Sequence, residues 1–250
     1  MNKEQRKQII FGRHPVVDAI QSGSSIDKIF LQQGIRGEFE KEIRGLSKQF
    51  SIPCQFVPKE KLAKMVRGNH QGIVAMLSLI SYYKIEDVLP MVYERSETPL
   101  LVLLDGITDV RNLGAIARSA EVCGAHAIVL PSKGSAMITA EGIKTSAGAL
   151  TKIPVCRENS LISTMDFLQQ SGIHIVASDL KGKKRVDQVD FTLPVAIVLG
   201  SEGEGVRSAV LEKANETFII PQKGTTDSLN VSVAAGIILY EAIRQRLGTD

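Results

Sequence analysis

The amino-acid sequence predicts an α/β protein with two parts, a small α/β unit followed by a larger domain built on a parallel sheet. From Leu100 onward, short apolar segments alternate with turns and helical segments. These segments are continuously apolar, as in the strands of a parallel sheet that is covered on both faces. The first 80 residues show a separate alternation of helical and extended patterns. A chain of 250 residues is long enough for two modest domains.

The N-terminal elements are predicted from local patterns. A helix is predicted to start in residues 15–20, because Pro15 is well accepted in a first helical turn. Residues 38–50 carry apolar side chains at spacings of four, three and four, which predicts an amphipathic helix. The other expected elements are extended segments at 28–31, 53–57 and 72–77 and a helix at 59–66.

A connector is predicted between the two parts. Residues 81–99 are acidic and contain Pro90 and Pro99. We therefore expect a small domain at residues 1–80, a linker at 81–99 and a second domain at 100–250.

The second domain is predicted as repeated strand–turn–helix units. Strands are expected at residues 100–104, 127–130, 174–177, 195–199 and 218–220, and helices at 114–123, 161–170, 206–214 and 232–247. The last helix has an apolar stripe too wide for a surface helix, so more than one of its faces is expected to be covered.

Composition narrows the class of protein. With 44% hydrophobic and 23% charged residues, the chain has the composition of a soluble globular protein. Its longest apolar runs are too short to span a bilayer, and no secretory signal is expected. The 3 cysteines are far apart and form no CxxC pair, and the 4 histidines have no ligand spacing, so neither disulfides nor a metal site is predicted. These features fit a reducing cytoplasm.

The positive charge is concentrated in the first third of the chain. Residues 1–80 contain 13 Lys and Arg against 7 Asp and Glu, whereas the whole chain has a net charge of only +3. This excess is compatible with an N-terminal surface for a polyanion, and equally with an ordinary solvated surface.

Three polar or glycine-rich turns follow apolar runs and are expected to form one composite site. They span residues 109–120, 199–205 and 227–235. The glycines of the second turn have the order GxxGxG, which is neither the dinucleotide fingerprint GxGxxG nor a P-loop. Glycines alone favour a simple tight turn, but Glu202 and Glu204 would repel a phosphate ligand and accept a cationic one.

Arg118 is a candidate functional cation. Its neighbours Ile116, Ala117 and Ala120 are small or apolar, as on a packed helix. The alternatives are a solvated surface arginine and an arginine that faces a cleft and holds phosphate with its planar fork of donors.

The three turns resemble, in order and spacing, the three motifs of the SpoU (TrmH-like) class of SPOUT RNA methyltransferases. The matching segments are residues 109–120, 198–206 and 219–236. Residues 11–15 and 70–73 resemble the two ends of a small substrate-binding domain related to ribosomal protein L30e. Within the class, this combination is most similar to the RlmB group, which methylates a guanosine 2′-hydroxyl of large-subunit (23S) ribosomal RNA.

The resemblance implies a deep trefoil knot, S-adenosyl-L-methionine as cofactor, ribosomal RNA as partner and a homodimer formed through the knotted domains. It places cofactor contacts at Gly200, Ile220 and Leu229, and the polar catalytic set at Asn112, Arg118, Glu202, Ser228 and Asn230. Val110 stands where many relatives have proline.

The resulting hypothesis is methyl transfer from S-adenosylmethionine to a ribose 2′-hydroxyl of ribosomal RNA. One alternative is the same chemistry on transfer RNA or at the ribosomal site of an antibiotic-resistance enzyme. Another is a non-catalytic RNA-binding protein that retains the fold. A nicotinamide-dependent oxidoreductase ranks below both, because no second βαβ half follows the glycine turn.

Overall fold

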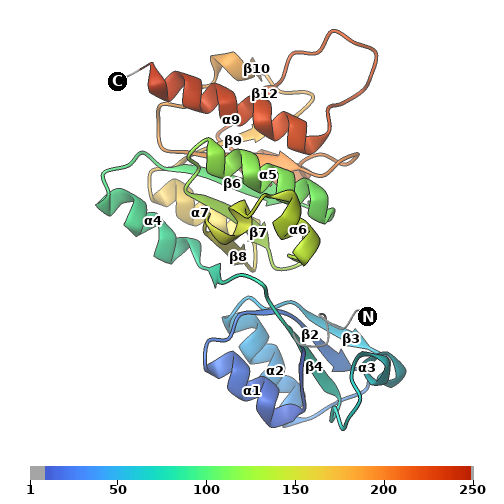
Figure 1. Ribbon diagram of the computed structural model, residues 1–250. Coiled ribbons are helices and arrows are strands. Elements are labelled where there is room, and N and C mark those ends of the chain that lie inside the picture. The colour runs from blue at the N-terminus through green and yellow to red at the C-terminus, as the bar shows by residue number, and fades with distance from the viewer. Residues whose placement is uncertain (1–8, 249–250) are drawn as a thin grey trace. The chain divides into compact units, whose positions relative to one another are not determined.

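The computed structural model describes residues 9–248 and divides the chain into two compact units, with the boundary between Ser81 and Tyr82 (Figure 1).

The first unit is a four-stranded sheet with helices on both faces. Its strand order is β1-β4-β2-β3, and only β2 and β3 run parallel. The strands are β1 (Ile9–Phe11), β2 (Ile26–Gln32), β3 (Cys54–Val57) and β4 (Ile73–Leu77), and the helices are α1 (Arg13–Gln21), α2 (Glu38–Gln49) and α3 (Lys59–Met65). Helices α1 and α2 cover one face around Val16, Ile20 and Ile43, while Leu62 of α3 packs on the other. The α/β class predicted for this part is confirmed.

The second unit is an eight-stranded parallel sheet with the order β10-β12-β9-β11-β6-β7-β8-β5. The strands are β5 (Tyr82–Tyr83), β6 (Leu100–Asp105), β7 (Ala127–Pro131), β8 (Val155–Glu158), β9 (His174–Ser178), β10 (Lys184–Arg185), β11 (Val195–Gly200) and β12 (Glu216–Ile219). Five of these were predicted from their apolar runs. Strand β8 was missed because Arg157 and Glu158 give it a polar end, although both are buried.

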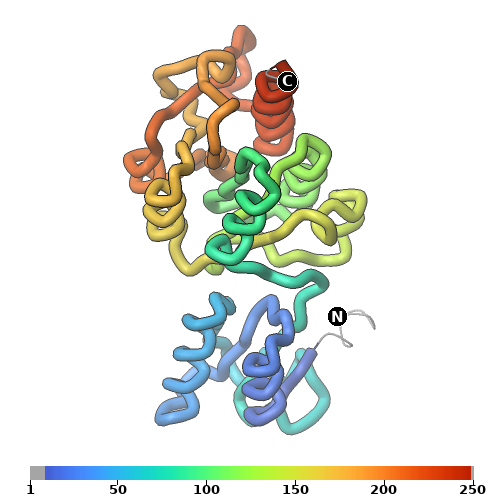
Figure 2. Tube along the Cα trace, turned by 90° about the vertical axis from the view of Figure 1, so that its left-hand side faces the viewer, coloured from blue at the N-terminus to red at the C-terminus, as the bar shows by residue number. Residues whose placement is uncertain are grey.

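Helices cover both faces of this sheet. The helices are α4 (Ile85–Glu94), α5 (Val110–Val122), α6 (Ala140–Thr145), α7 (Leu161–Gln170), α8 (Ser208–Lys213) and α9 (Val231–Leu247). Apolar side chains of α4, α7 and α8 form one core with Leu101, Leu103 and Val129. Helices α5 and α9 pack together on the opposite face, and Figure 2 shows α7 on one side of the sheet and α9 on the other.

The expectation of a linker at residues 81–99 is wrong for most of that segment. It forms β5 and α4, and Ile85, Val88 and Leu89 lie in the core of the second unit. The acidic residues that suggested a solvated connector, Glu86 and Asp87, occupy the first turn of α4, where the helix dipole favours negative charge. Pro90 is accommodated inside this helix.

Parallel strands carry their following loops to one edge of the sheet. The loops after β6, β9, β11 and β12 therefore meet at the carboxyl edge, and these loops contain the three polar turns noted in the sequence. Over residues 9–248, no helix is long and apolar enough to cross a membrane.

Candidate active site

Three polar side chains from distant segments meet at this edge. Asn112 lies in the first turn of α5, Glu202 in the loop after β11, and Asn230 caps α9. The Nδ2 of Asn112 donates to Oε1 of Glu202 at 3.0 Å, and the Nδ2 of Asn230 donates to Oδ1 of Asn112 at 3.2 Å. Asn230 Nδ2 also donates to the same Glu202 oxygen. We call these three residues the amide–carboxylate cluster.

The helix cap fixes the orientation of Asn230. Its Oδ1 accepts from the backbone N–H of Ser232 at 2.9 Å and of Val233 at 3.4 Å. These bonds satisfy free N–H groups at the start of α9, so the oxygen faces the helix and the NH₂ group faces Glu202. One side chain therefore both starts the helix and joins the cluster.

Asp109 performs the same capping role at α5. Its Oδ1 accepts from the backbone N–H of Arg111 at 2.7 Å, and the Arg111 guanidinium reaches Oδ2 at 3.1 Å. These hydrogen bonds from Arg111 hold the pKa of Asp109 below its ordinary value. The carboxylate thus stays ionised at the start of the helix that carries Asn112.

A pocket of about 420 Å³ lies beside the cluster. It falls within the usual size of small-molecule sites, roughly 300–1,000 Å³. All three residues expected to contact a cofactor line it, together with two of the expected catalytic residues: Gly200, Ile220, Leu229, Glu202 and Ser228.

The glycine turn after β11 forms one wall of this pocket. A Cβ added to Gly200 would lie 2.0 Å from the carbonyl carbon of Gly205 and 2.1 Å from the nitrogen of Val206, so only glycine fits. Ser201 and Gly205 exchange backbone hydrogen bonds of 3.1 and 3.0 Å, which close the turn. Gly203 and Gly205 have φ of 90° and 69°, values that glycine adopts without strain. The turn therefore presents backbone to the pocket and projects Glu202 toward the cluster.

An ion pair between the buried Asp105 and the exposed Arg207 anchors the end of this turn. Asp105, 1% exposed at the end of β6, accepts from the backbone nitrogen of Arg207 at 2.9 Å and from its Nε at 2.8 Å. Gly200 is the register partner of Asp105 across β6 and β11. Strand pairing therefore holds the start of the glycine turn beside β6, and the Asp105 carboxylate holds its end.

Some site residues were missed by sequence reasoning. Ser178 ends β9, Asp179 and Leu180 follow it, and all three line the pocket. The available signal was the polar pair directly after an apolar strand, at the edge where parallel strands end. Asp105 and Arg207 gave no signal, because 102 residues separate them.

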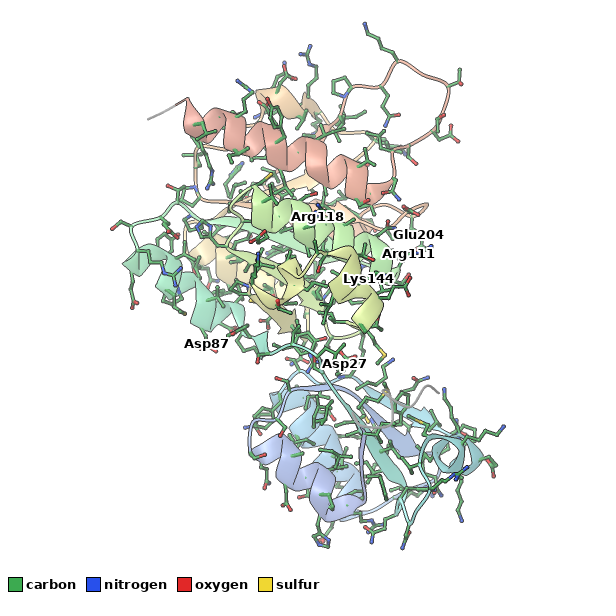
Figure 3. The ribbon with its side chains drawn as sticks, in the orientation of Figure 1. Asp27, Asp87, Arg111, Arg118, Lys144 and Glu204 are labelled. Carbon is green, nitrogen blue, oxygen red and sulfur yellow. The ribbon has the colours of Figure 1, made fainter. Side chains whose placement is uncertain are left out.

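Within the described residues, Arg118 and Ser228 make no hydrogen bond to the cluster. Ser228 is an exposed residue of the pocket wall. Arg118 is exposed, does not line the pocket, and has no hydrogen-bond or ion-pair partner in the part of the chain that the structure describes. Six residues separate Arg118 from Asn112, a rotation of about 240° around a helix. In Figure 3, Arg118 is labelled midway along α5, whereas Arg111 and Glu204 are labelled close to each other, to the right of it.

The arrangement suits a cationic organic ligand bound beside a polar cluster. The pocket combines apolar side chains, backbone of the glycine turn and the carboxylates of Asp179, Glu202 and Glu204. Within residues 9–248, no group of three or more His, Cys, Asp or Glu side chains is arranged to hold a metal ion.

Two family models match the two units. The model described as the SpoU rRNA Methylase family matches residues 99–240, and the model described as RNA 2′-O ribose methyltransferase substrate binding matches residues 9–83. A Bacillus subtilis protein described as a TrmH family tRNA/rRNA methyltransferase, YacO, is 35% identical over 243 residues, which is 97% of each chain. A Staphylococcus haemolyticus protein of the same description is 34% identical and covers 95% of this chain and 96% of its own.

Solved structures show the same fold. The SpoU methyltransferase AviRb of Streptomyces viridochromogenes, in complex with the cofactor AdoMet, is similar with a TM-score of 0.62 and 27% identity, over 99% of this chain and 94% of that one. An AdoMet-bound rRNA methyltransferase of Sinorhizobium meliloti has a TM-score of 0.61 and 26% identity, over 97% and 90% of the two chains.

Proposed function

The chain belongs to the SpoU (TrmH) family of RNA methyltransferases, and on that premise we propose that it methylates the ribose 2′-hydroxyl of a guanosine in 23S ribosomal RNA. The observation that carries the catalytic assignment is the amide–carboxylate cluster at the mouth of the pocket, because each member comes from a different motif. The guanosine and the ribosomal substrate are supported by the similarity of residues 1–80 to the substrate-binding domain of the RlmB group.

The cofactor is S-adenosyl-L-methionine, which when bound supplies a methyl group activated by its positive sulfur. The pocket fits such a group. Leu229 and Ile220 provide apolar walls for a base and ribose, and the backbone-lined turn at Gly200 allows close approach. The carboxylate of Glu202 beside the pocket is suited to a sulfonium and unsuited to a phosphate.

The protein contributes chiefly by positioning. Methyl transfer requires the 2′-oxygen in line with the sulfur–methyl bond, and holding two reactants in that geometry supplies much of the rate. The cluster is rigid, because Asn230 is held by the cap of α9 and Glu202 by the tied glycine turn. Asn112 and Glu202 would orient the acceptor ribose at the pocket mouth, while Ser228 and Asn230 would fix the adjoining loop.

Arg118 acts on the RNA side in this proposal. A guanidinium has hydrogen-bond donors and no acceptor, so Arg118 serves as a donor and not as a base. Its exposed side chain can hold a phosphate of the RNA next to the target ribose.

A homodimer formed through the second unit is part of the proposal. Helix α9 exposes Val233, Ile237 and Tyr240 at spacings of four and three, which place them on one stripe. Val122 of the neighbouring α5 is also 70% exposed. A second copy would cover this stripe. The trefoil knot of the family and a cytoplasmic location with ribosomal RNA belong to the same proposal.

The direct test is substrate mapping. The full-length protein would be incubated with S-adenosylmethionine carrying a labelled methyl group and with 23S ribosomal RNA, 16S ribosomal RNA or transfer RNA. We expect incorporation at one ribose of 23S RNA, located by resistance of that linkage to alkaline cleavage. Incorporation into transfer RNA alone would show that the substrate is transfer RNA and not 23S ribosomal RNA. Cofactor binding without methyl transfer to any RNA would favour a non-catalytic RNA-binding protein.

A further inference from the structure

The first unit contains a concave site in which donor groups predominate. A cavity of about 650 Å³ lies between the start of α1, the end of β2, the start of α3 and the loop before β4. Arg13, His14 and Lys59 line it, together with the segment 68–72. No Asp or Glu is among the described residues that line this cavity.

Three consecutive side chains of that segment have their acceptors occupied. Asn69 Oδ1 accepts from the backbone N–H of Gln71 at 3.3 Å, and Gln71 Oε1 accepts from the backbone N–H of Arg13 at 2.9 Å. His70 Nδ1 accepts from the backbone N–H of Gly72 at 3.0 Å. The groups of these side chains that have no hydrogen-bond partner among the described residues are donors, namely the NH₂ groups of Asn69 and Gln71 and the Nε2–H of His70.

The histidine is fixed in this orientation. His70 is only 8% exposed, and the bond at Nδ1 places its proton on Nε2, for which the described residues offer no partner. His70 lines the cavity, so its Nε2–H is a donor of fixed direction for a ligand that accepts a hydrogen bond there.

The backbone of the segment is braced. Gln71 has φ of 50°, and a Cβ at Gly72 would lie 2.3 Å from Cδ1 of Ile35. The carbonyl of Gly72 accepts from the backbone N–H of Gln32 at 2.8 Å, and Ile73 donates to the carbonyl of His70 at 2.9 Å. Backbone bonds and close packing thus hold the donors before any ligand arrives.

We infer that this cavity is a subsite for a backbone phosphate of the RNA substrate, an inference that rests on the proposed function. Phosphate oxygens are acceptors only, and they match a site of amide and imidazole donors with the charges of Arg13 and Lys59 beside them. Amide donors of fixed direction also distinguish this cavity from a diffuse basic surface, which would bind through charge alone. The subsite would set the register of the RNA and leave the choice of base to other contacts.

Substitution of Asn69 by Asp tests the donor requirement. Asn69→Asp retains the oxygen that accepts from Gln71 and replaces the donor NH₂ by a charged acceptor. Its matched control is Gln55→Glu, which adds the same charge at an exposed residue of β3 outside the cavity. We expect Asn69→Asp to weaken binding of 23S RNA to the full-length protein about tenfold more than the control does.

Substitution of Lys59 tests the phosphate contact. Affinity of the full-length protein for 23S RNA would be measured across a salt series for Lys59→Gln and for Lys41→Gln, an exposed lysine of α2 outside the cavity. Loss of one phosphate contact reduces the slope of log affinity against log salt by roughly 0.7–0.9. We expect that reduction for Lys59→Gln and a smaller one for Lys41→Gln.

The outcomes separate the subsite from the function. If each variant behaves as its control while the wild-type protein methylates 23S RNA, the subsite is wrong and the proposed function stands. If the cavity variants bind RNA like their controls but no longer bind inorganic phosphate, the site takes a free anion and the assignment to RNA is overturned. If methyl transfer is absent from the wild-type protein but the RNA-binding differences are found, the subsite stands and the function fails.

Discussion

At the scale of single residues, Asn230 shows how one amide serves both fold and site. Its oxygen caps α9, and its NH₂ group bridges Asn112 and Glu202. An aspartate at position 230 could still cap α9, but it could not bridge Asn112 and Glu202. An ionised carboxylate has no hydrogen-bond donor, and its negative charge would face that of Glu202.

Asn230→Asp should therefore leave the fold intact and reduce methyl transfer by on the order of 100-fold, the usual cost of losing one aligned donor. The matched control is Asn215→Asp, whose oxygen accepts from the backbone N–H of Ile175 at 2.8 Å and which does not line the pocket. Thermal denaturation and single-turnover methylation would be measured for both. A cluster without functional importance would give equal rates for the two variants.

Replacement of Arg118 should have a different effect from replacement of Asn230, because Arg118 contacts neither the cluster nor the pocket. Arg118→Ala should reduce methyl transfer by on the order of 100-fold while S-adenosylmethionine affinity stays unchanged. Calorimetry and single-turnover kinetics separate the two effects. Arg95→Ala, which removes an exposed arginine at the end of α4, is the control. Weakened cofactor binding in Arg118→Ala, or a normal rate, would contradict the assignment to the RNA side.

At the scale of elements, the glycine turn after β11 depends on backbone contact. A methyl group at Gly200 would overlap the backbone of Gly205 and Val206, and relief of that overlap must displace the turn that carries Glu202.

Gly200→Ala should lower stability by about 1–3 kcal/mol, the common cost of overpacking, and abolish cofactor binding. Gly224→Ala is the control, because it lies in another loop of the same edge and a Cβ there meets nothing within 4 Å. Denaturant unfolding and calorimetric titration with S-adenosylmethionine would be compared. Undiminished cofactor affinity in Gly200→Ala would show that the turn does not form the cofactor wall.

The elements also show which features a sequence pattern can predict. The strands β6, β7, β9 and β11 were predictable because buried parallel strands are continuously apolar. Strand β8 escaped because its polar residues are paired over long range: Arg157 lies 3.9 Å from the ring centroid of Tyr82, and Glu158 accepts from the backbone N–H of Ile85 at 3.0 Å. Helix α4 escaped because proline and acidic residues are typical of connectors as well as of helix starts.

The site was predictable only in part, because the contacts that assemble it join residues far apart in the sequence. The motifs are local, and the resemblance identified them together with the cofactor. The hydrogen bonds that join them are not local: 90 residues separate Asn112 from Glu202, and 118 separate it from Asn230. The pairing of Asp105 with Arg207 and the pocket wall after β9 follow from strand order, which hydrophobic periodicity does not determine.

At the scale of the whole molecule, the exposed stripe of α9 makes the oligomeric state testable. Tyr240 is 64% exposed and Val233 51% exposed, and burial of such side chains stabilises an interface by about 1.5–3 kcal/mol each. The wild-type protein should be a dimer by light scattering, and Tyr240→Glu should shift it toward monomer. Met91→Glu, which charges a side chain of α4 that is 50% exposed on the other layer, should not. A wild-type monomer at micromolar concentration would remove the dimer from the proposal.

The division into units also defines the fragment with which the role of the first 80 residues can be tested. Ile85, Val88, Leu89 and Val92 of α4 are each no more than 4% exposed. A fragment that starts at residue 100 would lose this helix and expose the core beneath it, at a cost of several kcal/mol. A fragment of residues 82–250 retains α4, the whole eight-stranded sheet and the pocket, so it should fold and bind S-adenosylmethionine.

The full-length protein should bind RNA with a steeper salt dependence than the 82–250 fragment. Each phosphate neutralised by a Lys or Arg contributes roughly 0.7–0.9 to the slope of log affinity against log salt. Residues 1–80 contain 13 basic against 7 acidic residues, whereas the rest of the chain contains 17 against 20. The cavity that contains Arg13 and Lys59 lies in the basic part as well. Affinity for 23S RNA would be measured between 50 and 200 mM salt, on the order of the range over which such slopes are resolved. Cofactor affinity serves as the control and should be equal in both proteins. Equal slopes would mean that the second unit makes all the phosphate contacts and that the basic excess of the first is only a solvated surface.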